Sequence, residues 1–230
     1  MKFYESKIQK CQQETSDSYS FICALPEGYQ WKAGQHARWR FVGFEDLEGE
    51  EAERIFTISS APEDGVLMFT TRIADPHSPL KDALLKRLQP DLPIQISDPL
   101  GKFTFHEGAK SSLCIAGGIG ITPVRSLLRH FSENPLEDHP ITLFYSDDRG
   151  EYAYGNFWDE MKQKMPNLEI QFFDDGKACG EATRAYARDH GNDAEYLIAG
   201  SPGMNKFYEG LLAEEGIEKD AIVTDKFMGY

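Results

Sequence analysis

The chain has 230 residues, 40% of them hydrophobic and 12% aromatic, which is enough for one large or two ordinary domains with apolar cores. Its formal net charge of −14 disfavours nucleic acids and anionic membrane surfaces as partners, because both are negatively charged. No run approaches the roughly 20 apolar residues of a membrane helix, and the first residues lack the apolar stretch of a signal peptide. We therefore expect a cytoplasmic protein without a membrane span.

The cysteines and histidines lack the close spacing of metal ligands. The four cysteines are far apart and form no Cys-x-x-Cys pair: Cys11, Cys23, Cys114 and Cys179. The six histidines are scattered as well. We therefore predict reduced cysteines, no metal site and no iron–sulfur cluster in this chain.

The first hundred residues predict short strands. Segments rich in β-branched or aromatic residues alternate with turn signals, at 19–25, 37–44, 54–59, 66–73 and 92–97. One helix interrupts them: Ser78 can cap it, Pro79 suits its first position, and leucines form a stripe along it. Strands of this length and spacing are typical of a small antiparallel barrel or sandwich.

After about residue 108 the pattern changes to alternating strands and helices. Strands are predicted at 113–116, 141–145, 168–173, 196–199 and 221–224, and helices at 122–131, 156–165, 181–190 and 204–215. This alternation predicts a parallel sheet with helices on both faces. We therefore predict two domains, an antiparallel β-barrel over residues 1–108 and an α/β domain over residues 109–230.

A glycine-rich turn opens the second half. The strand at 113–116 runs into Gly117, Gly118 and Gly120, and a helix follows. Glycines let a backbone turn sharply, and free N–H groups at a helix start suit a pyrophosphate. The dinucleotide fingerprint requires glycine where Pro123 stands, so this turn alone is equally consistent with a purely structural role.

The strand from Arg54 to Ser60 combines residue types that suit a flavin. Strand alternation predicts Arg54 and Phe56 on one face, with Thr57 and Ser59 on the other. An arginine can hold a phosphate, an aromatic ring can stack on a flat ring, and a hydroxyl can hydrogen-bond a ring nitrogen. Without other evidence, the segment is also consistent with an ordinary strand.

Four motifs in this order resemble the ferredoxin–NADP reductase superfamily. Residues 54–57 (Arg-Ile-Phe-Thr) are similar to its Arg-x-Tyr-Ser flavin motif, and residues 117–123 to its nicotinamide loop. Residues 199–204 are similar to its Cys-Gly-Pro region, and residues 224–230 to its closing segment. The resemblance covers nearly the whole chain and implies a flavin barrel followed by a nicotinamide-dinucleotide domain.

The resemblance implies roles for residues of the first half toward FAD. Arg54 would pair with the pyrophosphate, Phe56 would stack near the flavin ring, and Thr57 would hydrogen-bond near its reactive nitrogen. Ser59 joins the cofactor-binding set, and Ser78 would lie at the phosphates with the start of the helix. A capped helix N-terminus suits an anion on physical grounds too, although Ser78 can equally be a plain cap.

The nicotinamide dinucleotide, NADH or NADPH, would bind to the second half. The residues expected there come from the glycine turn, the region after the strand at 141–145, and the start of the last helix: Gly117, Gly118, Gly120, Thr122, Ser146, Arg149, Gly200 and Met204.

The C-terminal end carries three large apolar side chains directly after a predicted strand. In water they would form an exposed apolar patch, so we expect them to pack against the molecule. The resemblance implies that Phe227 lies over the flavin face opposite Phe56 and gates the nicotinamide, with Tyr230 as the second candidate. Thr57 and Phe227 are thus the expected catalytic residues.

Two departures from the family pattern bear on activity. Ala199 stands where the family usually has cysteine, which could loosen the nicotinamide site. Asp147 and Asp148 would repel a 2′-phosphate and accept ribose hydroxyls, whereas Arg149 would attract the phosphate, so the sequence leans only slightly toward NADH.

The leading interpretation is a flavin-dependent NAD(P)H oxidoreductase. It would pass a hydride from nicotinamide to FAD and electrons on to a separate acceptor: a ferredoxin-type protein, an oxygenase component or a small oxidant. Two alternatives stay open: a reductase that uses free flavin as its substrate, and a catalytically weak regulatory subunit that kept the fold.

Overall fold

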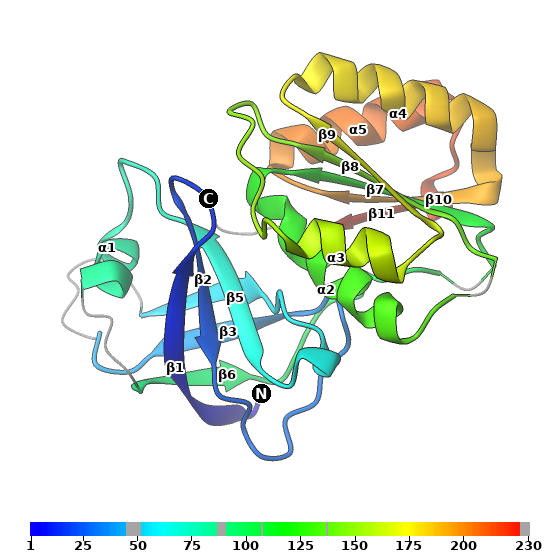
Figure 1. The fold of residues 1–230 in the computed structure, drawn as a ribbon. Helices are drawn as coiled ribbons and strands as arrows, with labels where there is room; N and C mark the ends of the chain where they lie inside the picture. Colours follow the sequence, from blue (N-terminus) through cyan, green and yellow to red (C-terminus); the bar gives the residue numbers. More distant parts are fainter. Residues whose placement is uncertain (45–51, 87–90, 107, 137, 226–230) are drawn as a thin grey trace.

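The structure, a computed structural model, describes residues 1–44, 52–86, 91–106, 108–136 and 138–225 (Figure 1). The first half forms a six-stranded sheet in the order β4-β3-β6-β1-β2-β5, and the assigned strand pairs are all antiparallel. Its elements are β1 Phe3–Gln13, β2 Ser18–Cys23, β3 His36–Phe41, β4 Glu53–Thr57, the 3₁₀ turn η1 Pro62–Asp64, β5 Leu67–Arg72, α1 Pro79–Lys86 and β6 Leu92–Ser97.

The first sheet closes on itself around an aromatic core. Just after β4, Ser59 N–H donates to Met68 O of β5 at 2.7 Å, so the two outermost strands meet. Fully buried side chains such as Phe21, Trp39 and Phe69 fill the interior. The predicted antiparallel barrel is confirmed.

Strand β1 was not expected from the sequence. It pairs with β2 on one side and β6 on the other, although most of its side chains are polar and exposed. Only Ser6 and Ile8 are buried along it. Both neighbours satisfy its backbone groups, so tertiary pairing stabilises a strand that hydrophobic alternation does not reveal.

The second half is a five-stranded parallel sheet in the order β11-β10-β7-β8-β9. Its strands are β7 Ser111–Gly117, β8 Ile141–Ser146, β9 Leu168–Phe173, β10 Ala194–Ala199 and β11 Ile222–Asp225. Helices α2 Ile121–Glu133 and α3 Phe157–Lys164 pack on one face, and α4 Gly176–His190 and α5 Pro202–Glu214 on the other (Figure 1). The predicted α/β architecture is confirmed, whereas the boundary at residue 108, between β6 and β7, stays a prediction.

Two helices begin earlier than their apolar patterns indicated. Asp175 caps α4 by accepting a hydrogen bond from Lys177 N–H at 2.9 Å, so this helix starts at Gly176 rather than at residue 181. Ser201 caps α5 by accepting from Met204 N–H at 3.2 Å, with Pro202 at the first position. In both cases polar capping sets the start, before the apolar stripe begins.

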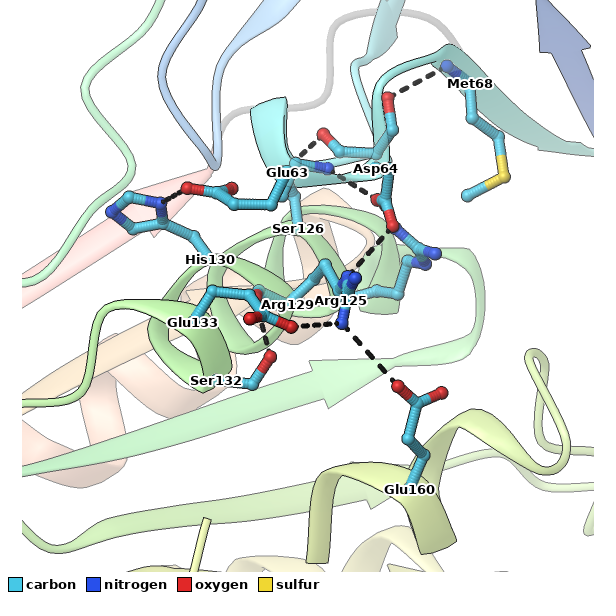
Figure 2. A network of polar contacts seen from close by, with 12 residues as sticks. Glu63, Asp64, Met68, Arg125, Ser126, Arg129, His130, Ser132, Glu133 and Glu160 are labelled. Carbon is cyan, nitrogen blue, oxygen red and sulfur yellow. Dashed lines mark hydrogen bonds and ion pairs between the residues drawn. The ribbon is translucent and has the colours of Figure 1, made fainter. Parts of the chain in front are cut away.

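A polar network joins the two sheets through η1 and α2 (Figure 2). The Asp64 carboxylate accepts hydrogen bonds from Arg125 and, at 3.1 Å, from Arg129. Next to it, Glu63 contacts the His130 ring at 2.7 Å, and Ser126 Oγ donates to Ser60 O at 2.7 Å. Because α2 follows the glycine turn directly, this network fixes that turn against the barrel.

Candidate active site

A cavity of about 660 Å³ opens on the barrel, and we call it the barrel-side cavity. Its walls come from β4, the end of β5, the start of α1, the glycine turn and the end of β11. Among the predicted residues, Arg54, Phe56, Thr57, Ser78 and Thr122 line it. Its volume is in the range typical of small-molecule and cofactor sites.

Three cations face the barrel-side cavity: Arg54, Arg72 and Lys81. Partial burial, together with the charges of Arg54 and Arg72, lowers the pKa of Lys81. Cations this close repel one another, so a bound anion would relieve that repulsion. Ser78 Oγ accepts from Lys81 N–H at 3.4 Å, and the start of α1 therefore faces the same space.

The aromatic and hydroxyl residues of β4 lie in the wall itself. The ring of Phe56 stacks on Phe69 with a centroid distance of 4.9 Å, and the side chain of Thr57 is buried at the cavity. The four residues 54–57 all line the cavity, so it runs along strand β4. Ser59 differs: it lines neither cavity, and its hydroxyl bonds to Met68 O at 3.0 Å.

A second cavity, of about 740 Å³, lies at the carboxyl ends of β7 and β8, and we call it the sheet-side cavity. The predicted residues Gly117, Gly118, Ser146, Arg149 and Met204 line it. Barrel residues complete the wall: Thr15, Ser18 and Arg72. Ligands of open parallel sheets bind at this edge, because loops and helix N-termini converge there.

Gly118 and Gly120 of the turn serve different purposes. Gly118 has a positive φ of 50° and borders the open cavity. Gly120 lines neither cavity; a Cβ there would lie 2.1 Å from Ala199 O, so this glycine permits close packing of the turn on β10. Ala199, where the family usually has cysteine, is fully buried and lines neither cavity.

Met204 fills the space above two glycines. A Cβ at Gly117 would lie 2.1 Å from its sulfur, and one at Gly200 would lie 2.3 Å away. Gly200 itself lines neither of the two cavities, whereas Met204 lines the sheet-side cavity. The two glycines thus make room for the thioether, which forms part of the sheet-side wall.

The two cavities meet, because Arg72 and Ile119 line both of them. A molecule in the sheet-side cavity can therefore approach one held in the barrel-side cavity. The predicted residues Phe227 and Tyr230 lie outside the described residues.

Comparisons with known proteins agree with this geometry. Residues 114–210 match the model of the oxidoreductase NAD-binding domain. A component of the Na(+)-translocating NADH-quinone reductase from Idiomarina loihiensis is 27% identical over 222 residues, covering 84% of this chain and 54% of that protein. The chain thus spans about half the length of the curated relatives it matches.

Two solved structures share the fold over nearly all of this chain. Ferredoxin-NADP+ reductase from Plasmodium falciparum has a TM-score of 0.79 at 16% identity, covering 98% of this chain and 96% of that one. The ferredoxin reductase of carbazole 1,9a-dioxygenase has a TM-score of 0.78 at 20% identity, covering 99% of this chain and 70% of that one. These likenesses show that the chain has the two-domain fold of these reductases.

The match over residues 114–210 agrees with the predicted oxidoreductase class and with a nicotinamide dinucleotide as one cofactor, whereas FAD as the other cofactor stays a prediction. The roles of individual residues stay predictions. Among the described residues, no helix is long and apolar enough to cross a membrane. Among the same residues, there is no cluster of three or more His, Cys, Asp or Glu side chains that could hold a metal ion.

Three residues at or beside the cavities escaped the sequence reasoning: Asp17, Arg72 and Asp225. Arg72 is the exposed last residue of a buried strand, and Asp17 lies in the turn before β2. Asp225 ends β11 and lines the barrel-side cavity, where burial raises the pKa of its carboxyl to about 7. Only Asp225 carried a signal, because it directly follows a predicted strand and lies within the closing segment 224–230.

Proposed function

We propose that this chain is an FAD-dependent NADH oxidoreductase that passes electrons to a separate acceptor. The observation that carries the proposal is the junction of the two cavities at Arg72 and Ile119. A dinucleotide in the sheet-side cavity would bring its nicotinamide toward a flavin in the barrel-side cavity. Holding two reactants in contact lowers the entropic part of the barrier, which is the protein's main contribution to such a transfer.

The residues of the barrel-side cavity fit FAD. Arg54 and Lys81 supply positive charge that suits a pyrophosphate, with Arg72, which pairs with Asp17, beside them. Phe56 offers an aromatic surface for the flavin ring. Thr57 would hydrogen-bond the ring. When bound, FAD supplies the hydride-accepting centre, and the chain's residues bind and orient it.

The sheet-side cavity suits NADH. Asp147 and Asp148 line it directly after β8, at the position where dinucleotide-binding sheets hold the adenosine ribose. Carboxylates accept hydrogen bonds from ribose hydroxyls and repel a 2′-phosphate. The glycine turn would support the pyrophosphate through Gly117 and Gly118, and Thr122 faces the flavin side.

The acceptor is proposed only by class. The relative from Idiomarina is named as part of a quinone reductase, and a structural neighbour as a ferredoxin reductase. A ferredoxin-type protein, an oxygenase component or a small oxidant would each fit an enzyme of this kind. We further propose a cytoplasmic location and a domain border between residues 108 and 109.

The experiment is reduction of the purified protein by NADH. The protein is incubated with FAD, passed through gel filtration without air, and mixed with NADH or NADPH while the visible flavin absorbance is followed. Co-elution of FAD and rapid bleaching by NADH support the proposal. FAD lost on the column, with turnover when free flavin is added, would favour a free-flavin reductase, and bound FAD without bleaching would favour a regulatory subunit.

A further inference from the structure

Arg149 is held by carboxylates from both halves of the molecule. Its Nη1 lies 2.7 Å from Asp17 Oδ2 of the barrel, and its Nε lies 3.4 Å from Asp147 Oδ1 in its own loop. Nη1 also donates to Ser16 Oγ at 3.3 Å. The guanidinium that would meet a 2′-phosphate is thus already neutralised where it lines the sheet-side cavity.

Asp17 is well placed to keep this pairing. It lies in the turn between β1 and β2, its side chain is only 13% exposed, and it also accepts from Arg72 Nε at 2.7 Å. Burial alone would raise the pKa of Asp17, but hydrogen bonds from Arg72 and Arg149 outweigh burial and lower it. The hydrogen bond to Asp17 in turn raises the pKa of Arg149.

The other charges near Arg149 do not replace it as a phosphate ligand. Asp147, Asp148 and Glu151 also line the sheet-side cavity and add negative charge. Lys177 lines it from the start of α4, and its Nζ lies 3.9 Å from the Glu181 carboxylate. Arg72 also lines this cavity, but it pairs with the same Asp17 carboxylate at 2.7 Å. An additional phosphate would therefore meet carboxylates and two paired arginines.

We propose that Asp17, a barrel residue, is a specificity-determining residue that selects NADH by holding Arg149 away from the 2′-phosphate of NADPH. This inference rests on the proposed function and adds a residue from outside the dinucleotide-binding half. It acts through Arg149, so Asp17 is a positioning residue that need not touch the substrate.

The test is the nearly isosteric Asp17→Asn variant, which removes one negative charge and frees both arginines. The ratio of kcat/KM for NADPH to that for NADH is expected to rise on the order of tenfold. Asp17→Glu, which keeps the charge, is expected to retain the low ratio. Calorimetric binding of 2′-phospho-AMP relative to AMP gives a second readout that needs neither flavin nor turnover, and it is expected to shift by a similar factor.

Glu14→Gln is the matched control. Glu14 lies beside the same turn and accepts from Tyr154 N–H at 3.1 Å, but it forms no hydrogen bond or ion pair with Arg149, both being described residues, and it lines neither cavity. A mere loosening of the turn would change kcat/KM for NADH and for NADPH by the same factor and leave their ratio unchanged. A ratio that rises as much in Glu14→Gln as in Asp17→Asn, or that stays unchanged in Asp17→Asn, overturns the inference.

Failure of the inference differs from failure of the proposed function. If the parent protein binds AMP and oxidises NADH, but the ratio of kcat/KM for NADPH to that for NADH is the same in Asp17→Asn as in the parent, only the inference is wrong. If the parent binds neither nucleotide and oxidises neither coenzyme, the proposed function fails, and the selective role of Asp17 fails with it.

Discussion

At the scale of single residues, Arg54 is the clearest test of the barrel-side cavity. Charge-assisted hydrogen bonds contribute roughly 1.5–3 kcal/mol each, so Arg54→Ala is expected to weaken FAD binding by about one to two powers of ten. Fluorescence titration of the apoprotein with FAD measures this. Arg40→Ala is the control, because Arg40 pairs with Glu53 on the same pair of strands and does not line the cavity. Equal affinities in the two variants would remove Arg54 from the flavin site.

Asp225 gives a prediction about pH. Its pKa is about 7 in the folded chain, against 3.8 as the ordinary value, so the folded state binds the proton more tightly. This contribution to stability is complete below the unfolded pKa and is lost as pH rises toward 7. Asp225→Asn cannot lose stability in this way. The difference in free energy of unfolding between Asp225→Asn and the parent is therefore expected to grow in favour of the variant by roughly 2–3 kcal/mol between about pH 5 and 8.

Denaturant unfolding of the apoprotein at both pH values measures this difference. The control is Asp220→Asn, because Asp220 is an exposed residue of the same C-terminal part of the chain. An advantage of Asp225→Asn that is independent of pH would mean that the carboxylate of Asp225 is solvated when the chain is folded.

At the scale of elements, the turn between β7 and α2 is the part most sensitive to side-chain bulk. Gly118→Val places a branched side chain beside the sheet-side cavity, so it is expected to lower kcat/KM for NADH at least tenfold while FAD stays bound. Steady-state kinetics with the flavin content of each preparation measure both effects.

Gly216→Val separates cavity filling from backbone strain. Gly216 also has a positive φ, 80°, but no atom would lie within 4 Å of its Cβ, and it lines neither cavity. Both variants carry a similar backbone cost of roughly 1–2 kcal/mol. If both lower kcat/KM to the same extent, strain rather than blocking of the cavity is the cause.

At the scale of the whole molecule, the network in Figure 2 holds the two halves together. Asp64 accepts from Arg125 and Arg129, and all three side chains are less than a fifth exposed. Asp64→Asn leaves Arg125 without its carboxylate partner, while Arg129 keeps Glu133 and Glu160, so we expect a loss of about 1–3 kcal/mol in the free energy of unfolding. Reduction of FAD by NADH is expected to slow, because the barrel and the parallel sheet would no longer be fixed in the relative position that brings the two cavities together.

Glu53→Gln is the matched control for this prediction. Glu53 also pairs with two arginines, Arg38 and Arg40, and its side chain is about as buried as that of Asp64. Glu53 and both arginines belong to the barrel, so this group does not join the two halves. It is expected to lower stability without slowing the transfer. An Asp64→Asn protein that unfolds like the parent would show that the network contributes little to joining the halves.

The sequence alone determined the architecture and part of each cavity wall. Period-two and βαβ patterns predicted an antiparallel barrel and a parallel sheet, because one-sided burial imposes these periods locally. The order of the motifs predicted which segments bind the cofactors, and residues such as Arg54 and Gly118 from those segments line the cavities. Chain direction is enough for this, since the carboxyl ends of parallel strands always share one edge.

Tertiary structure alone decided what depends on contacts between distant residues. Strand β1 exists because two neighbours pair with it, and Gly120 is required by packing on Ala199. The meeting of Asp17 with Arg149 joins residues 132 positions apart, across the border between barrel and sheet. Local patterns carry no record of such pairs, because each partner alone is an ordinary surface charge, and only the docking of the halves brings them to one cavity.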